Sequence, residues 1–270
     1  MRKGYKAVAT ELVRVIAETE LVKTLVLKPK RVFSFKAGQF VELLVPGVGE
    51  APFTPSSSPF RSEQIELTIM KAGRLSKQIH ELKPGAVMGL RGPYGKGYPI
   101  EEFFGKELLI VGGGVGLAPL RSLLWSVLEN RNKFSKLILV YGAKSPRDLI
   151  YRNELESWAK DGLSVHISVD VGDESWKGEV GVVTMLLPGI EVDVERAIAV
   201  VCGPPVMMKF SVGELLAKGL KPSQIYLSME RNMSCGIGKC GHCRLGNYYI
   251  CTDGPVFRYD KVEGISGLWD

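Results

Sequence analysis

The chain has 270 residues, of which 45% are hydrophobic and 24% charged, values typical of a globular protein with room for two modest domains. Its formal net charge is +6, but no basic cluster alternates with aromatic residues, which argues against a nucleic-acid partner. No stretch approaches eighteen uncharged apolar residues and no apolar segment follows the N-terminal charges, so we expect no membrane span, no signal peptide and a cytoplasmic protein with reduced thiols.

The first hundred residues read as short strands separated by turns. The runs Leu25–Leu27, Phe40–Val45 and Ile65–Ile69 have the length and composition of strands, and turn sequences such as Lys83–Gly85 divide them. Closely spaced strands with little helical periodicity favour an antiparallel β-barrel or sandwich. We therefore predict a first domain over residues 1–100.

From Gly105 onward, apolar strands alternate with helices. The predicted strands are Leu108–Val111, Leu137–Tyr141, Val165–Val169, Ala197–Val201 and Gln224–Ser228, and the predicted helices are Leu117–Asn130, Leu149–Lys160 and Pro205–Lys218. Buried strands that alternate with helices imply a parallel sheet, so residues 101–229 are predicted to form an α/β, Rossmann-like domain. Residues 230–270 are rich in glycine and cysteine and are predicted to form a third, small unit.

A glycine turn joins the first of these apolar strands to the helix that follows it. Its residues are Gly112, Gly113, Gly114, Val115, Gly116, Leu117, Ala118 and Pro119. Glycines let the backbone bend sharply and approach a pyrophosphate, and the amides of the following helix then face that anion. The same turn could also connect strand and helix without binding anything, and the acidic residue expected about twenty residues onward is not cleanly placed here.

Four of the five cysteines lie close together near the C-terminus, at Cys235, Cys240, Cys243 and Cys251. Their spacing is C-x4-C-x2-C-x7-C, and the first part of it matches plant-type [2Fe–2S] ligation. Intervening glycines allow the loop to wrap closely and to turn its amides toward sulfur. A structural zinc site is the alternative, since four thiolates also suit tetrahedral Zn²⁺, although zinc sites usually have two close cysteine pairs.

Together these motifs resemble those of the ferredoxin–NADP⁺ reductase superfamily. The segments that carry the resemblance follow the family's order and are Gly38–Phe40, Pro52–Thr54, Gly73–Ser76, Gly92–Gly95, Gly112–Pro119, Tyr141–Gly142 and Cys202–Pro205. The cysteine segment is similar to one iron–sulfur branch, which comprises the electron-transfer subunit of dihydroorotate dehydrogenase and the gamma subunits of sulfhydrogenases and anaerobic sulfite reductase. Its sequence most resembles that of the sulfhydrogenase gamma subunits.

The resemblance implies three sets of site residues. Those implied for FAD are Pro52, Phe53, Thr54, Thr68, Ile69, Met70, Gly73, Leu75 and Ser76, with Phe53 against the isoalloxazine ring and Thr54 near its N5 edge. Those implied for NAD(P) are Gly112, Gly113, Gly114, Val115, Gly116, Ala118, Pro119, Lys144, Arg147, Cys202, Gly203 and Pro204. Those implied for a [2Fe–2S] cluster are Cys235, Cys240, Cys243 and Cys251.

The sequence departs from the family pattern at the FAD strand. Many relatives have an arginine where this chain has Ala51 and a tyrosine where it has Phe53. The charge of the FAD phosphates must then be met elsewhere, and Lys71 and Arg74 are the candidates.

The choice of dinucleotide depends on three basic residues that follow the strand ending at Tyr141. Lys144, Arg147 and Arg152 could bind a 2′-phosphate and so favour NADPH, although solvated loop charges explain them equally well. Cys202 is isolated from the other thiols; we interpret it as a buried small side chain that borders the nicotinamide.

The function that the resemblance implies is electron transfer between NAD(P)(H) and a partner catalytic subunit. A nicotinamide exchanges two electrons as hydride, an iron–sulfur cluster exchanges one, and a flavin can do both. No terminal catalytic site is recognisable, so partner subunits are expected to supply it: a hydrogenase or sulfur reductase first, dihydroorotate dehydrogenase second and anaerobic sulfite reductase third. Two other classes of function are possible: a reductase that acts alone, and a zinc-stabilised binding module without redox activity.

Overall fold

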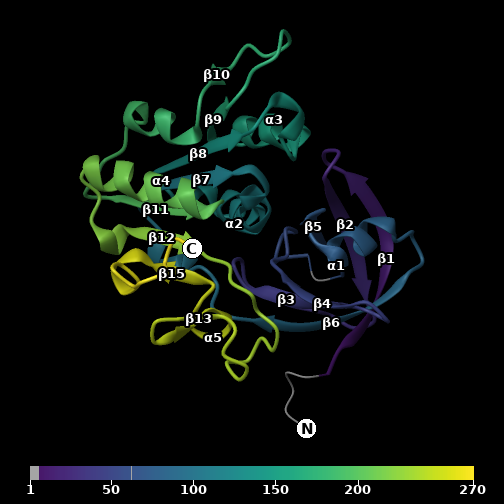
Figure 1. Ribbon diagram of the computed structural model, residues 1–270. Coiled ribbons are helices and arrows are strands. Elements are labelled where there is room, and N and C mark those ends of the chain that lie inside the picture. The colour runs from purple at the N-terminus through teal and green to yellow at the C-terminus, as the bar shows by residue number, and fades with distance from the viewer. Residues whose placement is uncertain (1–5, 62) are drawn as a thin grey trace.

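The computed structural model describes residues 6–61 and 63–270 of the chain. Two large sheets lie side by side, the first formed by the N-terminal third of the chain and the second by its middle (Figure 1). The cysteine-bearing C-terminal segment lies against both sheets. This arrangement places three predicted binding regions next to one another.

The first sheet has six antiparallel strands in the order β4-β3-β6-β1-β2-β5. Its elements are β1 (Val8–Ala17), β2 (Val22–Pro29), β3 (Phe40–Val45), β4 (Gly49–Phe53), β5 (Ile65–Met70), α1 (Arg74–Glu81) and β6 (Val87–Tyr94). Alternate side chains of a strand point to opposite faces, so residues such as Leu25, Leu43 and Leu67 meet inside the curved sheet. The predicted antiparallel β-barrel is confirmed.

The second sheet has seven strands in the order β10-β9-β8-β7-β11-β12-β15, and all neighbours are parallel except the pair β12 and β15. Its strands are β7 (Glu107–Gly113), β8 (Lys136–Ala143), β9 (Ser164–Val169), β10 (Glu179–Val180), β11 (Ala197–Cys202), β12 (Ile225–Ser228) and β15 (Val256–Arg258). The helices between them are α2 (Leu117–Glu129), α3 (Arg152–Lys160) and α4 (Pro205–Ala217). The predicted α/β architecture with a parallel sheet is confirmed.

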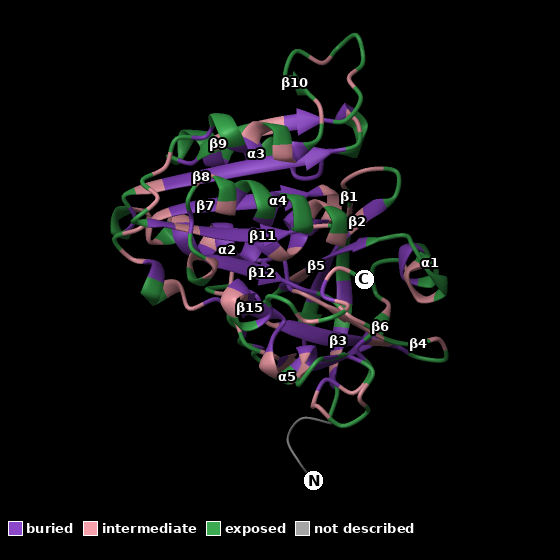
Figure 2. Cartoon of the chain, turned by 60° about the vertical axis from the view of Figure 1, so that its left-hand side comes forward, coloured by how far each residue is buried: buried purple, intermediate pink, exposed green. Residues whose placement is uncertain are grey.

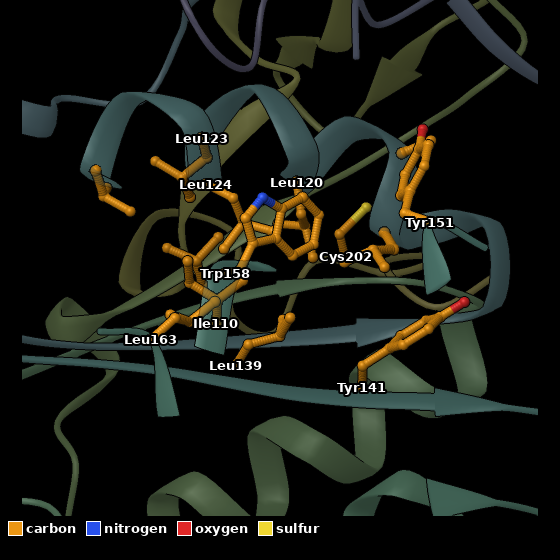
Figure 3. Close-up of a cluster of buried hydrophobic side chains, with 14 of the residues drawn as sticks. Ile110, Leu120, Leu123, Leu124, Leu139, Tyr141, Tyr151, Trp158, Leu163 and Cys202 are labelled. Carbon is orange, nitrogen blue, oxygen red and sulfur yellow. The ribbon is translucent and has the colours of Figure 1, made fainter. Parts of the chain in front are cut away.

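Both faces of this parallel sheet are covered. Leu108 and Ile110 of β7 belong to one apolar core, whereas their neighbours Leu109 and Val111 belong to the core on the other face. Figure 3 shows the first core, in which the fully buried Trp158 of α3 lies among leucines of α2 and of the sheet. This double coverage explains why the strands read as continuous apolar runs.

The predicted helix Leu149–Lys160 begins three residues late. Leu149 and Ile150 are buried in the core, and Tyr151 has a left-handed backbone with φ of 55°, so α3 starts at Arg152. The amide of Tyr151 donates to Glu18 Oε2 of the first domain at 3.1 Å. A contact with a residue far away in sequence therefore sets this helix boundary.

The C-terminal segment shares its core with the second sheet. It contains β13 (Arg244–Leu245), β14 (Tyr248–Tyr249) and α5 (Ile250–Asp253), and its last strand, β15, extends the large sheet at β12. Cys243, Ile250 and Phe257 are buried in the same cluster as strands β7 and β11. The segment is therefore held rigidly against the second sheet.

Burial follows this layering. Figure 2 shows strands that are mostly buried, with the exposed residues on the outer faces of the helices and in the loops. Within residues 6–61 and 63–270, no helix has both the length and the apolar character that crossing a membrane requires.

Candidate functional site

The loops at the ends of β7 and β11 meet at the centre of the second sheet. β8 and β9 lie on one side of β7, whereas β11 and β12 lie on the other. The strand order therefore reverses between β7 and β11, and open α/β sheets bind ligands at such a point, beyond the carboxyl ends of the strands. The predicted glycine turn Gly112–Gly116 ends β7, and the predicted segment Cys202–Pro204 ends β11.

The two loops are in direct contact because they carry glycine. A Cβ atom on Gly116 would lie 2.6 Å from the carbonyl oxygen of Cys202 and 2.7 Å from Cα of Gly203. Gly114 has a φ of +54°, and its carbonyl accepts a hydrogen bond from the hydroxyl of Tyr141 at 3.3 Å. The structure thus brings the predicted dinucleotide residues of both loops into one cradle, which is fixed to β8 through Tyr141.

We expect Gly116→Ala to weaken dinucleotide binding by at least about tenfold, since the added methyl group cannot fit without moving the backbone of Cys202 and Gly203. Titration of dinucleotide against the flavoprotein measures this change. Gly213→Ala is the matched control because Gly213 lies in α4, and its added methyl group would have no atom within 4 Å. Equal affinities for the two variants would contradict the prediction.

The remaining predicted dinucleotide residues lie around this cradle. Lys144 and Arg147 are exposed just beyond β8, the strand next to β7. Cys202 is buried, and burial raises the pKa of its thiol to about 12 although Ser228 lowers it by hydrogen bonding. A thiol with so high a pKa stays protonated at neutral pH, so its chemistry does not favour a nucleophile.

The predicted flavin residues of β5 lie on a strand that contacts the glycine turn, and those at the end of β4 are partly open to solvent. Pro52, Phe53 and Thr54 are half-buried, and β5 lies against the turn Gly114–Gly116. The buried hydroxyl of Thr68 makes hydrogen bonds with Thr24, Ser56 and Tyr151. Ile69 belongs to the core of the first sheet, whereas Met70 at the end of β5 is 43% exposed.

The remaining predicted FAD residues surround the start of α1. The hydroxyl of Ser76 accepts hydrogen bonds from the amides of Ala72 and Gly73 at 2.9 and 2.8 Å and donates to the carbonyl of Gly73. Leu75 packs against the core of the first sheet. Lys71 and Arg74, the two alternative phosphate partners, are exposed on either side of this turn. The helix start is therefore open, preorganised and flanked by positive charge.

The four C-terminal cysteines lie in residues 235–251, the segment called the cysteine loop below, and they differ in exposure. Cys243 and Cys251 are buried, Cys235 is half-buried and Cys240 is exposed. Backbone amides point at the sulfur atoms: Lys239 donates to Cys235 Sγ at 3.3 Å and Gly238 donates to Cys251 Sγ at 3.1 Å. Amide donors of this kind stabilise thiolate charge, which cluster ligands require.

The thiols interact in two pairs. Apart from burial, which raises both pKa values, Cys240 lowers the pKa of its neighbour Cys235, and Cys243 raises the pKa of its neighbour Cys251. Burial by itself raises the pKa of Cys235, but amide hydrogen bonds lower it overall, whereas burial and Cys243 raise the pKa of Cys251. Two thiolates per iron is the requirement of a two-iron cluster, so the donor set fits one. Within residues 6–61 and 63–270, no three His, Cys, Asp or Glu side chains converge on one ion position.

A buried arginine connects the first sheet to the cysteine loop. Arg91 of β6 forms an ion pair with Glu50 of β4 at 2.6 Å and donates to the hydroxyl of Tyr94 and to the carbonyl of Cys235 at 2.9 and 3.5 Å. Gly236 packs on the ring of Tyr94, where a Cβ atom would come within 2.9 Å. The cysteine loop is therefore fixed against β6, which is linked through Arg91 and Glu50 to β4, the strand of Pro52 and Phe53.

Sequence reasoning missed the charged residues of this junction. Glu42 of β3 is completely buried, both of its carboxylate oxygens lack a hydrogen-bond partner in the structure, and its Cα neighbours on the adjacent strands are Pro52 and Arg91. Burial, with the charge of Glu50, raises the pKa of Glu42 to about 8. A single acidic residue inside the apolar run Phe40–Val45 was the available signal.

Three family models match successive parts of the chain. The oxidoreductase FAD-binding domain matches residues 7–98, the oxidoreductase NAD-binding domain matches residues 110–212, and the iron-sulfur cluster binding domain of dihydroorotate dehydrogenase B matches residues 230–263. These matches follow the order of the three regions described above.

Solved structures share the fold. An NADH-dependent reduced ferredoxin-NADP oxidoreductase superposes with a TM-score of 0.74 at 24% identity, over 96% of this chain and 92% of its own. A ferredoxin NADP⁺ reductase from Neisseria gonorrhoeae superposes with a TM-score of 0.72 at 22% identity, over 82% of this chain and 98% of its own.

Two curated relatives are more similar in sequence. The sulfhydrogenase 2 subunit gamma of Pyrococcus furiosus is 43% identical, over 87% of each chain. A probable dihydroorotate dehydrogenase B (NAD(+)) electron transfer subunit of Thermococcus kodakarensis is 34% identical, over 86% of this chain and 88% of its own. The chain therefore belongs to the family of FAD- and NAD-binding oxidoreductase subunits with a C-terminal iron–sulfur domain, which includes the sulfhydrogenase gamma subunits and the dihydroorotate dehydrogenase B electron transfer subunits.

Proposed function

We propose that the chain is an electron-transfer subunit that moves electrons between NAD(P)(H) and a partner catalytic subunit through FAD and a [2Fe–2S] cluster. The observation that carries the proposal is that the predicted flavin sheet contacts both of the other regions: β5 lies against the glycine turn Gly114–Gly116, and β6 contacts the cysteine loop. Strand β4 has the predicted flavin residue Pro52, its neighbour β3 has Glu42 and the next strand β6 has Arg91, which contacts Cys235 of the cysteine loop. Two strand spacings separate β4 from β6, which is about 10 Å.

The proposed division of labour follows the two sheets and the C-terminal segment. Residues 1–100 hold FAD through Pro52–Thr54, Thr68–Met70 and the start of α1. Residues 101–229 hold the dinucleotide through the cradle of the glycine turn and Cys202–Pro204. Residues 230–270 hold the cluster through Cys235, Cys240, Cys243 and Cys251.

The side chains of this protein bind and orient, whereas the redox chemistry belongs to the cofactors. FAD, when bound, exchanges hydride with a nicotinamide and single electrons with an iron–sulfur cluster. Phe53 provides an apolar surface for the flavin ring, and Thr54 provides a hydroxyl for hydrogen bonding at its edge. The amides of Gly238 and Lys239 stabilise thiolate charge in the cysteine loop.

The exposed side of the cysteine loop is the proposed exit for electrons. Cys240 is exposed and Cys235 is half-buried, whereas Cys243 and Cys251 are buried, so the side of Cys240 is the most accessible approach for a partner subunit. Exposed basic residues Lys239 and Arg244 lie on this loop and suit an acidic partner surface. We place the assembled complex in the cytoplasm.

An anaerobic titration tests the proposed function. Purified protein reconstituted with FAD and iron is expected to be yellow-brown, to contain two irons per chain, and to lose its visible absorbance when NADH or NADPH is added. Colourless protein with stoichiometric zinc and no reduction by either dinucleotide would overturn the proposal in favour of a zinc-stabilised module.

The partner is proposed to be a hydrogenase or sulfur reductase, because a sulfhydrogenase gamma subunit is 43% identical over most of both chains. Dihydroorotate dehydrogenase is the second candidate, favoured by the match of residues 230–263 to the iron–sulfur domain of that enzyme, and anaerobic sulfite reductase is the third. Affinity purification from native cells separates the candidates: hydrogen-dependent reduction of NAD(P)⁺ supports the first, and dihydroorotate-dependent reduction supports the second.

We propose NADPH as the dinucleotide, based on Lys144 and Arg147 beside the cradle. The double substitution of both residues by glutamine is expected to raise the KM for NADPH about tenfold or more and to change that for NADH less than about threefold, since only NADPH has the 2′-phosphate. Steady-state reduction of a dye by each dinucleotide measures the ratio. Lys160→Gln, at the exposed end of α3, is the control, and a parallel change for both dinucleotides would refute NADPH selectivity.

A further inference from the structure

Arg121 of α2 is a buried charged residue at the junction of the two domains. It is only 7% exposed and lies five positions after Gly116, on the helix that the predicted dinucleotide turn begins. Its partners come from both sides of the junction. Such a residue needs an explanation, since burying a charge is costly unless it is fully paired.

The guanidinium of Arg121 binds three partners, one in the second domain and two in the first. Toward the second domain, it binds Glu154 of α3 through two hydrogen bonds, of 2.8 and 2.6 Å. Toward the first domain, it binds Glu66 of β5 and the carbonyl of Ser56, the latter at 3.1 Å. Burial by itself lowers the pKa of Arg121, but Glu154 and Glu66 raise it overall, so the charge is retained.

Tyr151, the residue just before α3, reinforces the same junction. Its ring lies 4.6 Å from the guanidinium carbon of Arg121, and its hydroxyl donates to Thr68 of β5. Its backbone amide donates to Glu18 in the loop between β1 and β2. The second domain therefore contacts three residues near the predicted flavin site. Arg121 binds Ser56 and Glu66, and Tyr151 binds Thr68.

These contacts lie close in sequence to both proposed cofactor-binding regions. Ser56 is two residues beyond Thr54, the residue proposed to lie at the edge of the flavin. Arg121 is on the second turn of the helix that starts at the dinucleotide cradle. One side chain thus ties the helix that follows the glycine turn to the chain segment that follows the predicted flavin residue Thr54.

We propose that Arg121 is a positioning residue that sets the separation and stacking of nicotinamide and isoalloxazine by clamping α2 to the flavin strands at Ser56 and Glu66. The inference rests on the proposed function, since it assumes that both rings bind where that function places them. Hydride transfer is steeply sensitive to misplacement, and an error of about 1 Å can cost a hundredfold in rate. Without this clamp the junction would depend on the contacts of Tyr151, and the ring separation would be less closely defined.

The chemistry of the clamp requires arginine. A guanidinium has five donors in a fixed plane and can bind two carboxylates and a carbonyl together, whereas an ammonium group is a point charge on a flexible stem. An apolar side chain of similar volume often gives equal stability at buried ion pairs, so stability alone does not account for a charged residue here. The need to hold Glu154, Glu66 and Ser56 in a fixed geometry does account for an arginine at this position.

Rapid-mixing kinetics of Arg121→Met tests the inference. With FAD content and dinucleotide affinity unchanged within about threefold, flavin reduction at saturating NAD(P)H is expected to slow by about 10- to 100-fold. The long-wavelength charge-transfer absorbance of the flavin–nicotinamide complex is expected to weaken, since it requires ring overlap. Arg121→Lys is expected to restore less than half of either signal.

Two further variants separate positioning from ordinary stabilisation. Glu66→Gln removes the charged partner in the first domain and is expected to reproduce the slow flavin reduction; it carries the test if Arg121→Met does not retain FAD. Arg131→Lys is the control, because the hydrogen bonds of Arg131 within the described part of the chain go to carbonyls of its own domain, at Gly162 and Phe134. Variants that melt earlier but reduce flavin at the rate of the unmodified protein, with an unchanged charge-transfer band, would overturn the inference.

The failure of this inference is distinguishable from failure of the proposed function. If the unmodified protein binds FAD and is reduced by NAD(P)H while Arg121→Met is equally fast, the positioning role is wrong and the electron-transfer function stands. If the unmodified protein is itself not reduced, the proposed function is wrong and the inference falls with it.

Discussion

Cys251→Ala is expected to remove the iron–sulfur cluster and to cut electron delivery to a one-electron acceptor by at least about a hundredfold, while NAD(P)H still reduces the flavin. The thiol of Cys251 is buried, paired with Cys243 and bonded to the amide of Gly238. Alanine supplies no ligand, and one missing thiolate leaves an iron without its full coordination. Iron analysis, visible absorbance and electron paramagnetic resonance of the reduced protein measure the loss.

The fifth cysteine provides the control for this experiment. Cys202 is buried at the end of β11, belongs to a different core cluster from Cys243 and Cys251, and is hydrogen-bonded to Ser228. Cys202→Ala is therefore expected to keep two irons per chain. Loss of iron in both variants would point to general unfolding, and a full cluster in Cys251→Ala would mean that this residue is not a ligand.

The free energy of unfolding of the unmodified protein is expected to fall as the pH rises from about 5 to about 8. In Glu42→Gln, most of this decrease is expected to be absent. Burial comes first among the causes that raise the pKa of Glu42 from 4.5 to about 8, followed by the charge of Glu50, whereas Arg91 opposes them. Cys235 adds to the increase. The carboxyl therefore stays protonated in the folded protein at a pH where the unfolded chain releases the proton.

The sign of the effect follows from proton binding. Between the unfolded and folded pKa values the folded state holds more protons, so the free energy of unfolding decreases as the pH rises, and the contribution present below pH 4.5 is lost by about pH 8. The loss is at most on the order of 5 kcal/mol, since the folded pKa of about 8 lies well above the unfolded value of 4.5 and one pKa unit corresponds to about 1.4 kcal/mol. Glutamine does not titrate, so its own burial cost is independent of pH.

Thermal unfolding followed by circular dichroism from about pH 5 to 9 measures this effect at constant cofactor content. Glu11→Gln is the matched control, because Glu11 is an exposed carboxylate on β1 of the same sheet. Its curve is expected to parallel that of the unmodified protein. A Glu42→Gln curve with the same slope as the control would show that Glu42 is ionised in the folded state.

Local sequence patterns were sufficient to predict most of the strands and helices of the second sheet and several strands of the first. The strand Phe40–Val45 coincides with β3, and the helix Leu117–Asn130 ends one residue beyond α2. These elements are apolar runs bounded by glycine or turn residues, so their signal lies within the element. The start of α3 was missed, since Tyr151 takes its conformation while bound to Glu18, which is 133 positions away.

The sequence by itself determined the chemistry of the site: the spacing of Cys235, Cys240, Cys243 and Cys251, and a glycine turn between a buried strand and a helix. Such features are local, because one short segment supplies all of the groups involved. Only the tertiary structure decided which segments are neighbours. It pairs β15 with β12 and places Arg121 between Glu66 and Glu154. The environment of a buried charge depends on residues that are distant in sequence, so no local pattern reveals it.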